Sequence, residues 1–176
     1  MRSSRALVLI VLFVVAVAAA WWFTTRQQKS AIGDTITVYY AKADGTTLVP
    51  WQVTLNAQRR ERSDPALDRR SSVFYAATQC VAGPPPGTEA VRFPAGTHVL
   101  AADVQGSTAD VDISKEVASS AEGGFAESAE FKALVWTLTQ PKFGITSVNV
   151  RIAGARVATL PGGHLELDEP LSRSSF

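Results

Sequence analysis

The strongest feature of the hydropathy pattern is an uncharged apolar run near the N-terminus. Residues 6–23 read ALVLIVLFVVAVAAAWWF and carry no charged side chain. A helix needs roughly 20 apolar residues to span the hydrocarbon core of a bilayer, with about 17 at the lower end. Two arginines precede the run and two tryptophans close it, as expected for a cytoplasmic flank and a headgroup-level aromatic belt. The pattern predicts a cytoplasmic stub over 1–5, a single-pass transmembrane helix over 6–23 and a linker over 24–34.

A cleaved signal peptide is the competing interpretation of the same run. Ala16-Val17-Ala18 and Ala18-Ala19-Ala20 both resemble A-x-A cleavage sites. The run is longer than the usual apolar region of a signal peptide, about 7–15 residues, and its aromatic end continues past both cuts. Arg26 and Lys29 place positive charge on the outer flank, which weakens the predicted orientation. Both interpretations place the rest of the chain outside the cytoplasm, either anchored in the cell membrane or secreted.

Beyond the linker, short segments with strand periodicity come in pairs. Thr35–Ala41 and Thr47–Leu55 are rich in β-branched and aromatic residues and are joined by an Asp-Gly turn, so they predict a hairpin. Pro50 inside the second segment indicates an edge position or a bulge. His98–Val104 and Thr108–Ile113 form the next pair, and the second of these alternates apolar residues with aspartates. That alternation is typical of a strand with one solvent-facing side.

Two segments have helical periodicity. Asp64-Pro65 opens the first, since aspartate caps free N–H groups and proline at the first helical position loses no hydrogen bond. Its candidate inward residues share helical spacing: Leu67, Phe74, Ala77 and Val81. The second helix is predicted over Glu127–Gln140 and ends at Pro141. Its buried stripe is expected to contain Phe131, Leu134, Val135 and Leu138.

A further strand over Thr146–Ile152 and a return strand over Arg156–Leu160 complete the order β-β-α-β-β-α-β-β. Hairpins interleaved with two helices predict an α+β domain over residues 35–173, with a mixed sheet and both helices on one of its faces.

Composition limits the chemistry of this domain. The chain has 17 basic and 16 acidic residues, which argues against nucleic-acid binding driven by net charge. Its one cysteine, Cys80, lies in an apolar helix and is expected to be a buried core residue; intermolecular pairing and nucleophilic catalysis are the alternatives. His98 and His164 are too few for a metal centre, so neither a metal nor another cofactor is predicted. A turn histidine bonded to nearby backbone or carboxylate is expected at His164.

No nucleotide-binding, zinc-protease or serine-hydrolase motif occurs in the sequence. Asp110 and Asp112 share one strand face at a separation of roughly 7 Å from the strand rise, which is compatible with the carboxylate pair of an inverting glycosidase. Aspartates on a wet strand are more often simply solvated, so no catalytic residue is predicted.

Charge is unevenly distributed. The segment 103–130 holds seven acids and a single base, Lys115, and Asp103 is the first of those acids. Five arginines gather before and within the first helix: Arg59, Arg60, Arg62, Arg69 and Arg70. Ordinary solvated charge is the expected explanation. The functional alternative is a domain with a basic and an acidic side, which would associate with an acidic partner, a second copy or an anionic wall polymer.

An ordered set of short motifs resembles one known family, the GerMN domain of sporulation and spore-germination proteins. The set runs from about Thr35 to Arg173. It comprises Val38-Tyr39-Tyr40, Leu48-Val49-Pro50, Ala82-Gly83-Pro84, Pro94-Ala95-Gly96-Thr97 with Val99-Leu100, Val111-Asp112-Ile113-Ser114-Lys115-Glu116, Leu134-Val135-Trp136-Thr137-Leu138-Thr139, Ile152-Ala153-Gly154, Leu160-Pro161-Gly162-Gly163-His164 and Pro170-Leu171. The chain departs from sporulation members in having a single copy, no lipoprotein cysteine and a Pro84-Pro85-Pro86 run.

The resemblance implies a fold similar to ring-forming modules of transenvelope complexes, with no accepted catalytic residues. It therefore implies a non-enzymatic scaffold or interaction factor of the cell envelope, whose partner would be an envelope protein or a cell-wall polymer. A small cell-wall glycan hydrolase and a small-ligand-binding domain are the alternatives.

Overall fold

The computed structural model describes residues 35–55, 65–119, 124–161 and 163–176. The predicted membrane segment over 6–23 and its linker lie outside these ranges. Among the helices of the described ranges, none is both long enough and apolar enough to cross a bilayer.

The elements follow the predicted order closely, with boundaries that differ by up to three residues from the predicted ones. The described ranges also contain three 3₁₀ turns: η2 (Lys115–Ser119), η3 (Pro141–Phe143) and η4 (Arg173–Ser175). The strands and α-helices are β1 (Thr35–Ala41), β2 (Leu48–Thr54), α2 (Pro65–Ala82), β3 (Val99–Gln105), β4 (Thr108–Ile113), α3 (Gly124–Leu138) and β5 (Ser147–Ile152).

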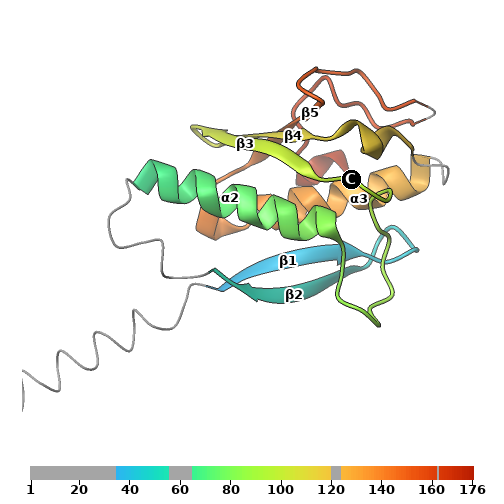
Figure 1. Cartoon of the computed structure of the whole chain (residues 1–176), viewed down its shortest axis with the longest axis horizontal. Helices are drawn as coiled ribbons and strands as arrows, with labels where there is room; N and C mark the ends of the chain where they lie inside the picture. The colour runs from blue at the N-terminus through green and yellow to red at the C-terminus, as the bar shows by residue number, and fades with distance from the viewer. Residues whose placement is uncertain (1–34, 56–64, 120–123, 162) are drawn as a thin grey trace, which may run out of the picture.

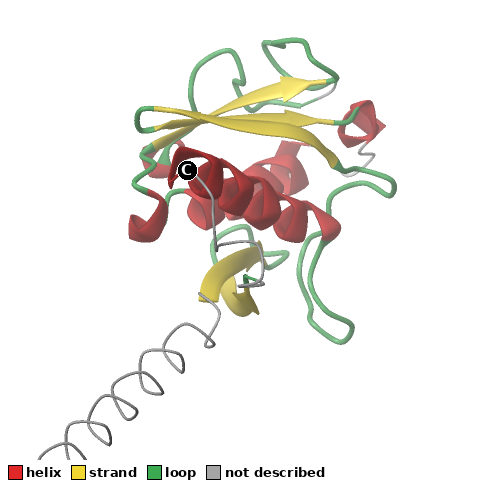
Figure 2. Cartoon of the chain, turned by 60° about the vertical axis from the view of Figure 1, so that its left-hand side comes forward, coloured by secondary structure: helices red, strands yellow, loops and turns green. Residues whose placement is uncertain are grey.

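The strands form two sheets, which corrects the predicted single sheet, whereas both helices do lie on one face of the mixed three-stranded sheet (Figures 1 and 2). β1 and β2 make an antiparallel hairpin, whereas β3, β4 and β5 make a mixed sheet in which β4 and β5 are parallel. Figures 1 and 2 show α2 and α3 between the hairpin on one side and the three-stranded sheet on the other. The α+β class with two helices is confirmed.

The sheets separate because β1 uses its second edge to bind a helix. The backbone N–H of Thr37 donates to Oε1 of Gln140 at 3.3 Å, and Nε2 of Gln140 donates to the Thr37 carbonyl at 3.0 Å. The N–H of Tyr39 donates to Oγ1 of Thr137 at 2.9 Å. Backbone groups on a strand edge must find partners when they are buried. Here Thr137 of α3 and Gln140, just beyond the end of α3, take the place of a third strand.

The outer edge of β2 carries Pro50, as predicted for an edge position. Pro50 lies opposite Tyr39 in the hairpin. Since the N–H of Tyr39 points away from β2, the backbone of residue 50 points away from β1, and the missing proline donor breaks no bond of the hairpin.

The predicted return strand over Arg156–Leu160 is wrong. Ala153 and Gly154 make a tight turn with positive φ at both residues, but only Ala155 then pairs with Ile152. The outer edge of β5 is instead taken by Leu171, which exchanges two 2.8 Å backbone hydrogen bonds with Val148. The described residues of the segment 156–170, between these two contacts, therefore do not form a strand of this sheet.

The two helices bury different kinds of surface. The predicted stripe of α3 is confirmed, since Phe131, Leu134, Val135 and Leu138 are fully buried. On α2 the predicted inward position of Phe74 is wrong, because that ring is exposed and Val73 takes the buried position beside Ala77 and Val81. The inward side of α2 is therefore made of small residues, which lets the helix lie close to its neighbours.

Candidate functional site on the three-stranded sheet

The predicted acidic residues lie on the solvent side of the three-stranded sheet, which we call the polar face. β4 places Ala109, Val111 and Ile113 in the core, so alternation turns its two aspartates outward. The pairing register sets Asp103 opposite Asp110, and Asp112 opposite Arg151 of β5. A shallow groove of about 240 Å³ runs over these side chains, with Arg70 at its margin.

Each carboxylate of β4 is bound by a neighbouring donor. Nδ2 of Asn149 donates to Oδ1 of Asp110 at 3.0 Å. The backbone N–H of Gly154 donates to Oδ1 of Asp112 at 2.8 Å and so fixes the turn that follows β5. The two side chains therefore stabilise the join between β4 and β5.

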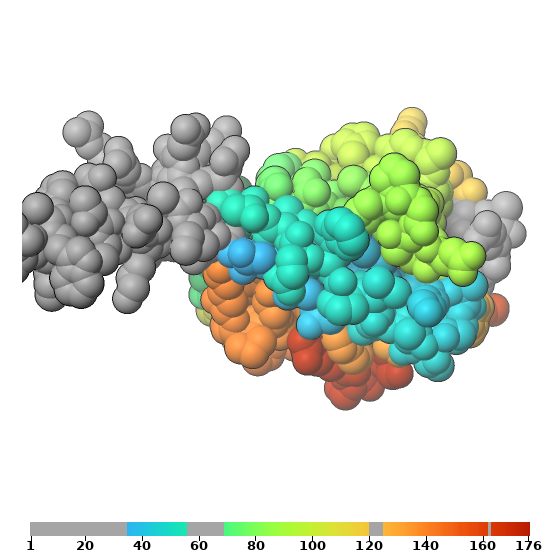
Figure 3. Space-filling model, turned by 90° about the horizontal axis from the view of Figure 1, so that it is seen from below, coloured from blue at the N-terminus to red at the C-terminus, as the bar shows by residue number. Residues whose placement is uncertain are grey.

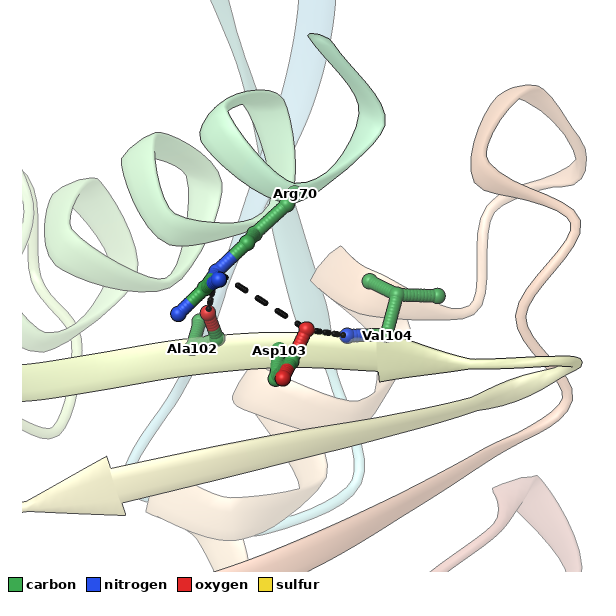
Figure 4. Close-up of polar contacts among 4 residues, drawn as sticks. All are labelled: Arg70, Ala102, Asp103 and Val104. Carbon is green, nitrogen blue, oxygen red and sulfur yellow. Dashed lines mark hydrogen bonds and ion pairs between the residues drawn. The ribbon is translucent and has the colours of Figure 1, made fainter. Parts of the chain in front are cut away.

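Asp103 acts at the free edge of β3 (Figure 4). Its Oδ1 accepts a 2.8 Å hydrogen bond from the N–H of Val104 and lies 3.7 Å from Nε of Arg70. The same Nε donates to the carbonyl of Ala102 at 3.0 Å. The pair covers two edge groups that another strand could bind, which is a common protection of sheet edges.

The two histidines lie apart from this face. Nδ1 of His98 lies 2.8 Å from the carbonyl of Gly96, within its own loop. His164 has an exposed side chain, and its contact with a carboxylate is made by the main chain: its N–H donates to Oε2 of Glu127 at 3.1 Å. In the described ranges no three His, Cys, Asp or Glu side chains gather closely enough to hold a metal ion.

Cys80 is buried, as predicted. Its Sγ lies 3.6 Å from the carbonyl of Tyr39, so it covers one more edge group of β1. Burial raises the pKa of the thiol to about 12, against a smaller opposing contribution from the Thr137 hydroxyl. Since the thiolate is the reactive form, this sulfur is a packing group in the folded domain.

The predicted arginine cluster is only partly described. Arg59, Arg60 and Arg62 lie outside the described residues. Arg69 donates from Nε to the carbonyl of Phe143 at 2.7 Å, whereas Arg70 reaches β3, so these neighbouring side chains anchor the start of α2 to two different elements.

Sequence patterns gave no warning of Glu127. Its side chain is almost fully buried, with Oε2 bound to the His164 N–H and no hydrogen-bond partner for Oε1. Gly163 packs so tightly on this carboxylate that an added Cβ would collide with both oxygens. Gly163 belongs to a Gly-Gly-His motif in the sequence, but the carboxylate on which it packs lies 36 residues earlier, in a segment whose acidic residues have no distinguishing pattern.

These features define a class: an α+β domain with two helices between a hairpin and a small mixed sheet, whose acidic side chains make structural hydrogen bonds. The sequence profile described as "Germane: Sporulation and spore germination" matches residues 37–158. The chain belongs to this family, the GerMN domains, which is not known as an enzyme family.

Solved structures agree with this assignment. The tandem GerMN domains of the sporulation protein GerM from Bacillus subtilis superpose with a TM-score of 0.60 at 25% identity, over 81% of this chain and 47% of theirs. This chain thus spans about half of the tandem protein. The first GerMN domain of GerM alone gives a TM-score of 0.58 at 26% identity, over 80% of this chain and 98% of that one.

A putative lipoprotein from Clostridium perfringens shares the fold, with a TM-score of 0.55 at 18% identity over 81% of this chain and 90% of that one. No curated protein matches the chain.

Proposed function

We propose that this protein is a membrane-anchored, extracytoplasmic and non-enzymatic interaction module of the cell envelope. The anchor is the apolar run over 6–23, and the GerMN domain is presented on the outer side. Membership of a family of sporulation and germination domains supports an envelope role.

One observation carries the non-enzymatic part. Asp110 and Asp112, the two residues considered as a hydrolytic pair, instead bond Asn149 and the turn at Gly154, and their neighbour Asp103 pairs with Arg70. Aspartates that stabilise the sheet by such bonds are consistent with a rigid surface for recognition. The polar face, with acidic and basic side chains along one groove, would then recognise a charged partner.

Topology and processing test the anchor. A reporter fused after Phe176 should be active outside the cytoplasm, and the mature chain should retain Trp21 and Trp22. A native N-terminus that begins after Ala18 or Ala20 would contradict the anchor and favour secretion.

Crosslinking pull-down of the full-length membrane protein tests the interaction. Arg59→Glu with Arg70→Glu should recover less envelope material at low salt, because exposed charges act over about a Debye length, ~8 Å at physiological salt. Lys115→Glu with Arg156→Glu makes the same total charge change at two exposed positions of the described domain and serves as the control. If both double variants recover the same amount of envelope material at low and at high salt, the proposal of charge-directed binding is wrong.

A further inference from the structure

A second groove lies away from the polar face, between the turn of the β1–β2 hairpin and the loop that leads from α2 to β3. It encloses about 630 Å³, within the range of roughly 300–1,000 Å³ for ligand pockets. Residues 42–44 form one wall and residues 89–92 form the other. Figure 3 shows the green loop standing beside the blue and cyan hairpin. The groove lies at the far end of β1 from Thr35, about 20 Å along the strand.

Both walls are held in place by bonds within the domain. Asp44 accepts the N–H groups of Thr46 and Thr47 at 2.9 and 2.8 Å, and Nζ of Lys132 reaches the carbonyl of Gly45 at 3.2 Å. These contacts fix the hairpin turn against α3.

The loop wall is fixed as well. The N–H of Val91 donates to the carbonyl of Ala41 at 2.7 Å, and a guanidinium nitrogen of Arg92 donates to the carbonyl of Pro84 at 3.0 Å. A groove with two anchored walls is formed before any ligand arrives, which lowers the entropy lost on binding.

Each wall carries one charged side chain that makes no pair within the described part of the chain, and these two side chains have opposite charges. Lys42 comes from the hairpin and Glu89 from the loop; both are exposed, and neither side chain makes a hydrogen bond or an ion pair with the described residues. The carboxylate of Asp44 is already used within its turn. An ammonium and a carboxylate that border one groove but do not pair leave a complementary space for a molecule carrying both charges.

We propose that this groove binds a short peptide that carries a carboxylate and an ammonium group. The ligand carboxylate lies at Lys42, with Arg92 as a second cation on the opposite wall, and the ligand ammonium lies at Glu89. This inference does not depend on the membrane anchor or on the polar face, and its test leaves both unaffected.

Calorimetric titration of the full chain in detergent tests the proposal. The probe is a tetrapeptide with free termini, one glutamate and one lysine. Its acetylated and amidated counterpart, with glutamine and norleucine, has the same length and no charge. The charged peptide should bind at least tenfold more tightly than the neutral one.

Charge reversal provides the sharper result. Lys42→Glu replaces the unpaired cation of the hairpin wall by an anion, and Glu89→Lys replaces the unpaired anion of the loop wall by a cation, so each should weaken binding of the charged peptide tenfold or more. The double variant Lys42→Glu with Glu89→Lys exchanges the two unpaired charges between the walls and should regain most of the affinity, since a peptide can bind in the reverse direction. A purely structural role of these exposed residues would not give this rescue.

Lys115→Glu with Glu166→Lys is the matched control and should bind like the unaltered chain. Unchanged melting temperatures would show that the variants fold. Equal affinity for charged and neutral peptides, no binding of either, or single reversals without effect would each overturn the proposal.

Discussion

The two sheets of this domain protect their edges in different ways. The edge of the hairpin is held by the end of a helix, because Thr137 of α3 and Gln140, two residues beyond α3, bond the inner edge of β1. The two edges of the three-stranded sheet are covered differently. The exposed pair of Arg70 and Asp103 covers the β3 edge, and Leu171 covers the β5 edge by backbone pairing.

This difference separates buried from exposed polar groups. Thr137 and Gln140 are buried, whereas the side chains of Arg70 and Asp103 are each 52% exposed. An unpaired polar group in the interior costs far more free energy than a lost surface ion pair. Substitutions at the hairpin edge should therefore lower the stability of the fold more than substitutions at the β3 edge. Both losses of stability should be the same with and without a ligand.

The largest effect is expected from Leu138→Ala. Leu138 is fully buried in α3, the helix that lies between the two sheets. Emptying a core leucine site destabilises a protein by about 2–5 kcal/mol, and here both sheets should unfold together. Denaturant unfolding followed by circular dichroism measures it. A change near zero would contradict the packing described for α3.

Thr137→Val should rank second. The change keeps the shape of the side chain but leaves the N–H of Tyr39 without an acceptor, at a penalty of about 1–3 kcal/mol. Thr78→Val is the matched control on α2, because that hydroxyl bonds only to the Phe74 carbonyl of its own helix. If the two variants unfold at the same denaturant concentration, α3 does not hold the hairpin edge.

Asp112→Ala should have a moderate effect. It removes the hydrogen bond to the Gly154 N–H, an interaction typically worth about 0.5–1.5 kcal/mol. Asp110→Ala should lower stability by a similar amount, because it removes the hydrogen bond that Nδ2 of Asn149 donates. Urea midpoints report both changes, and a loss as large as that of Leu138→Ala would mean that the polar face is not solvent-facing.

A smaller effect is expected at the β3 edge. Asp103→Ala breaks an exposed ion pair with Arg70, and such pairs contribute about 0.2–1 kcal/mol. The more informative readout is self-association, because the edge groups of Ala102 and Val104 lose part of their cover. Sedimentation at rising protein concentration should reveal weak association of the variant that exceeds any association of the unaltered chain. Equal sedimentation of the two chains would contradict the protective role of this pair.

The smallest effect is a pH dependence in the hairpin turn. The Thr47 N–H, its hydroxyl and the Thr46 N–H lower the pKa of Asp44 from 3.8 to about 2. A carboxylate with a lowered folded-state pKa stabilises the fold above its unfolded pKa and loses that contribution as pH falls from about 4 towards 2. Melting temperatures of Asp44→Ala should fall less over this interval than those of the unaltered chain. Parallel curves would contradict the turn geometry.

Much of the fold could be predicted because local patterns carry it. Alternation in Thr108–Ile113 fixes which side of β4 is buried, and the heptad-like stripe of α3 fixes its core contacts. Edge pairing could not be predicted, since a glutamine at position 140 and a threonine at 37 are 103 residues apart and nothing local connects them. The division into two sheets could not be predicted either, because it depends on these contacts between residues far apart in the sequence.

The candidate site was predicted in part. The wet aspartates and buried Cys80 follow from periodicity and apolar context. Their partners, Asn149 and the Gly154 N–H, depend on the parallel register of β4 and β5, which no turn signal sets. Phe74 shows the limit of helical spacing, because one residue of rotation moves a ring from the core to the surface.

Amide hydrogen exchange, resolved by residue, tests most directly whether Thr137 and Gln140, at and just beyond the end of α3, replace a third strand. The N–H groups of Thr37 and Tyr39 should exchange slowly in the unaltered chain. In the double variant Thr137→Val with Gln140→Leu they should exchange far faster, while amides of β4 stay protected. Fast exchange of Thr37 and Tyr39 before any substitution, or protection that survives it, would contradict the account.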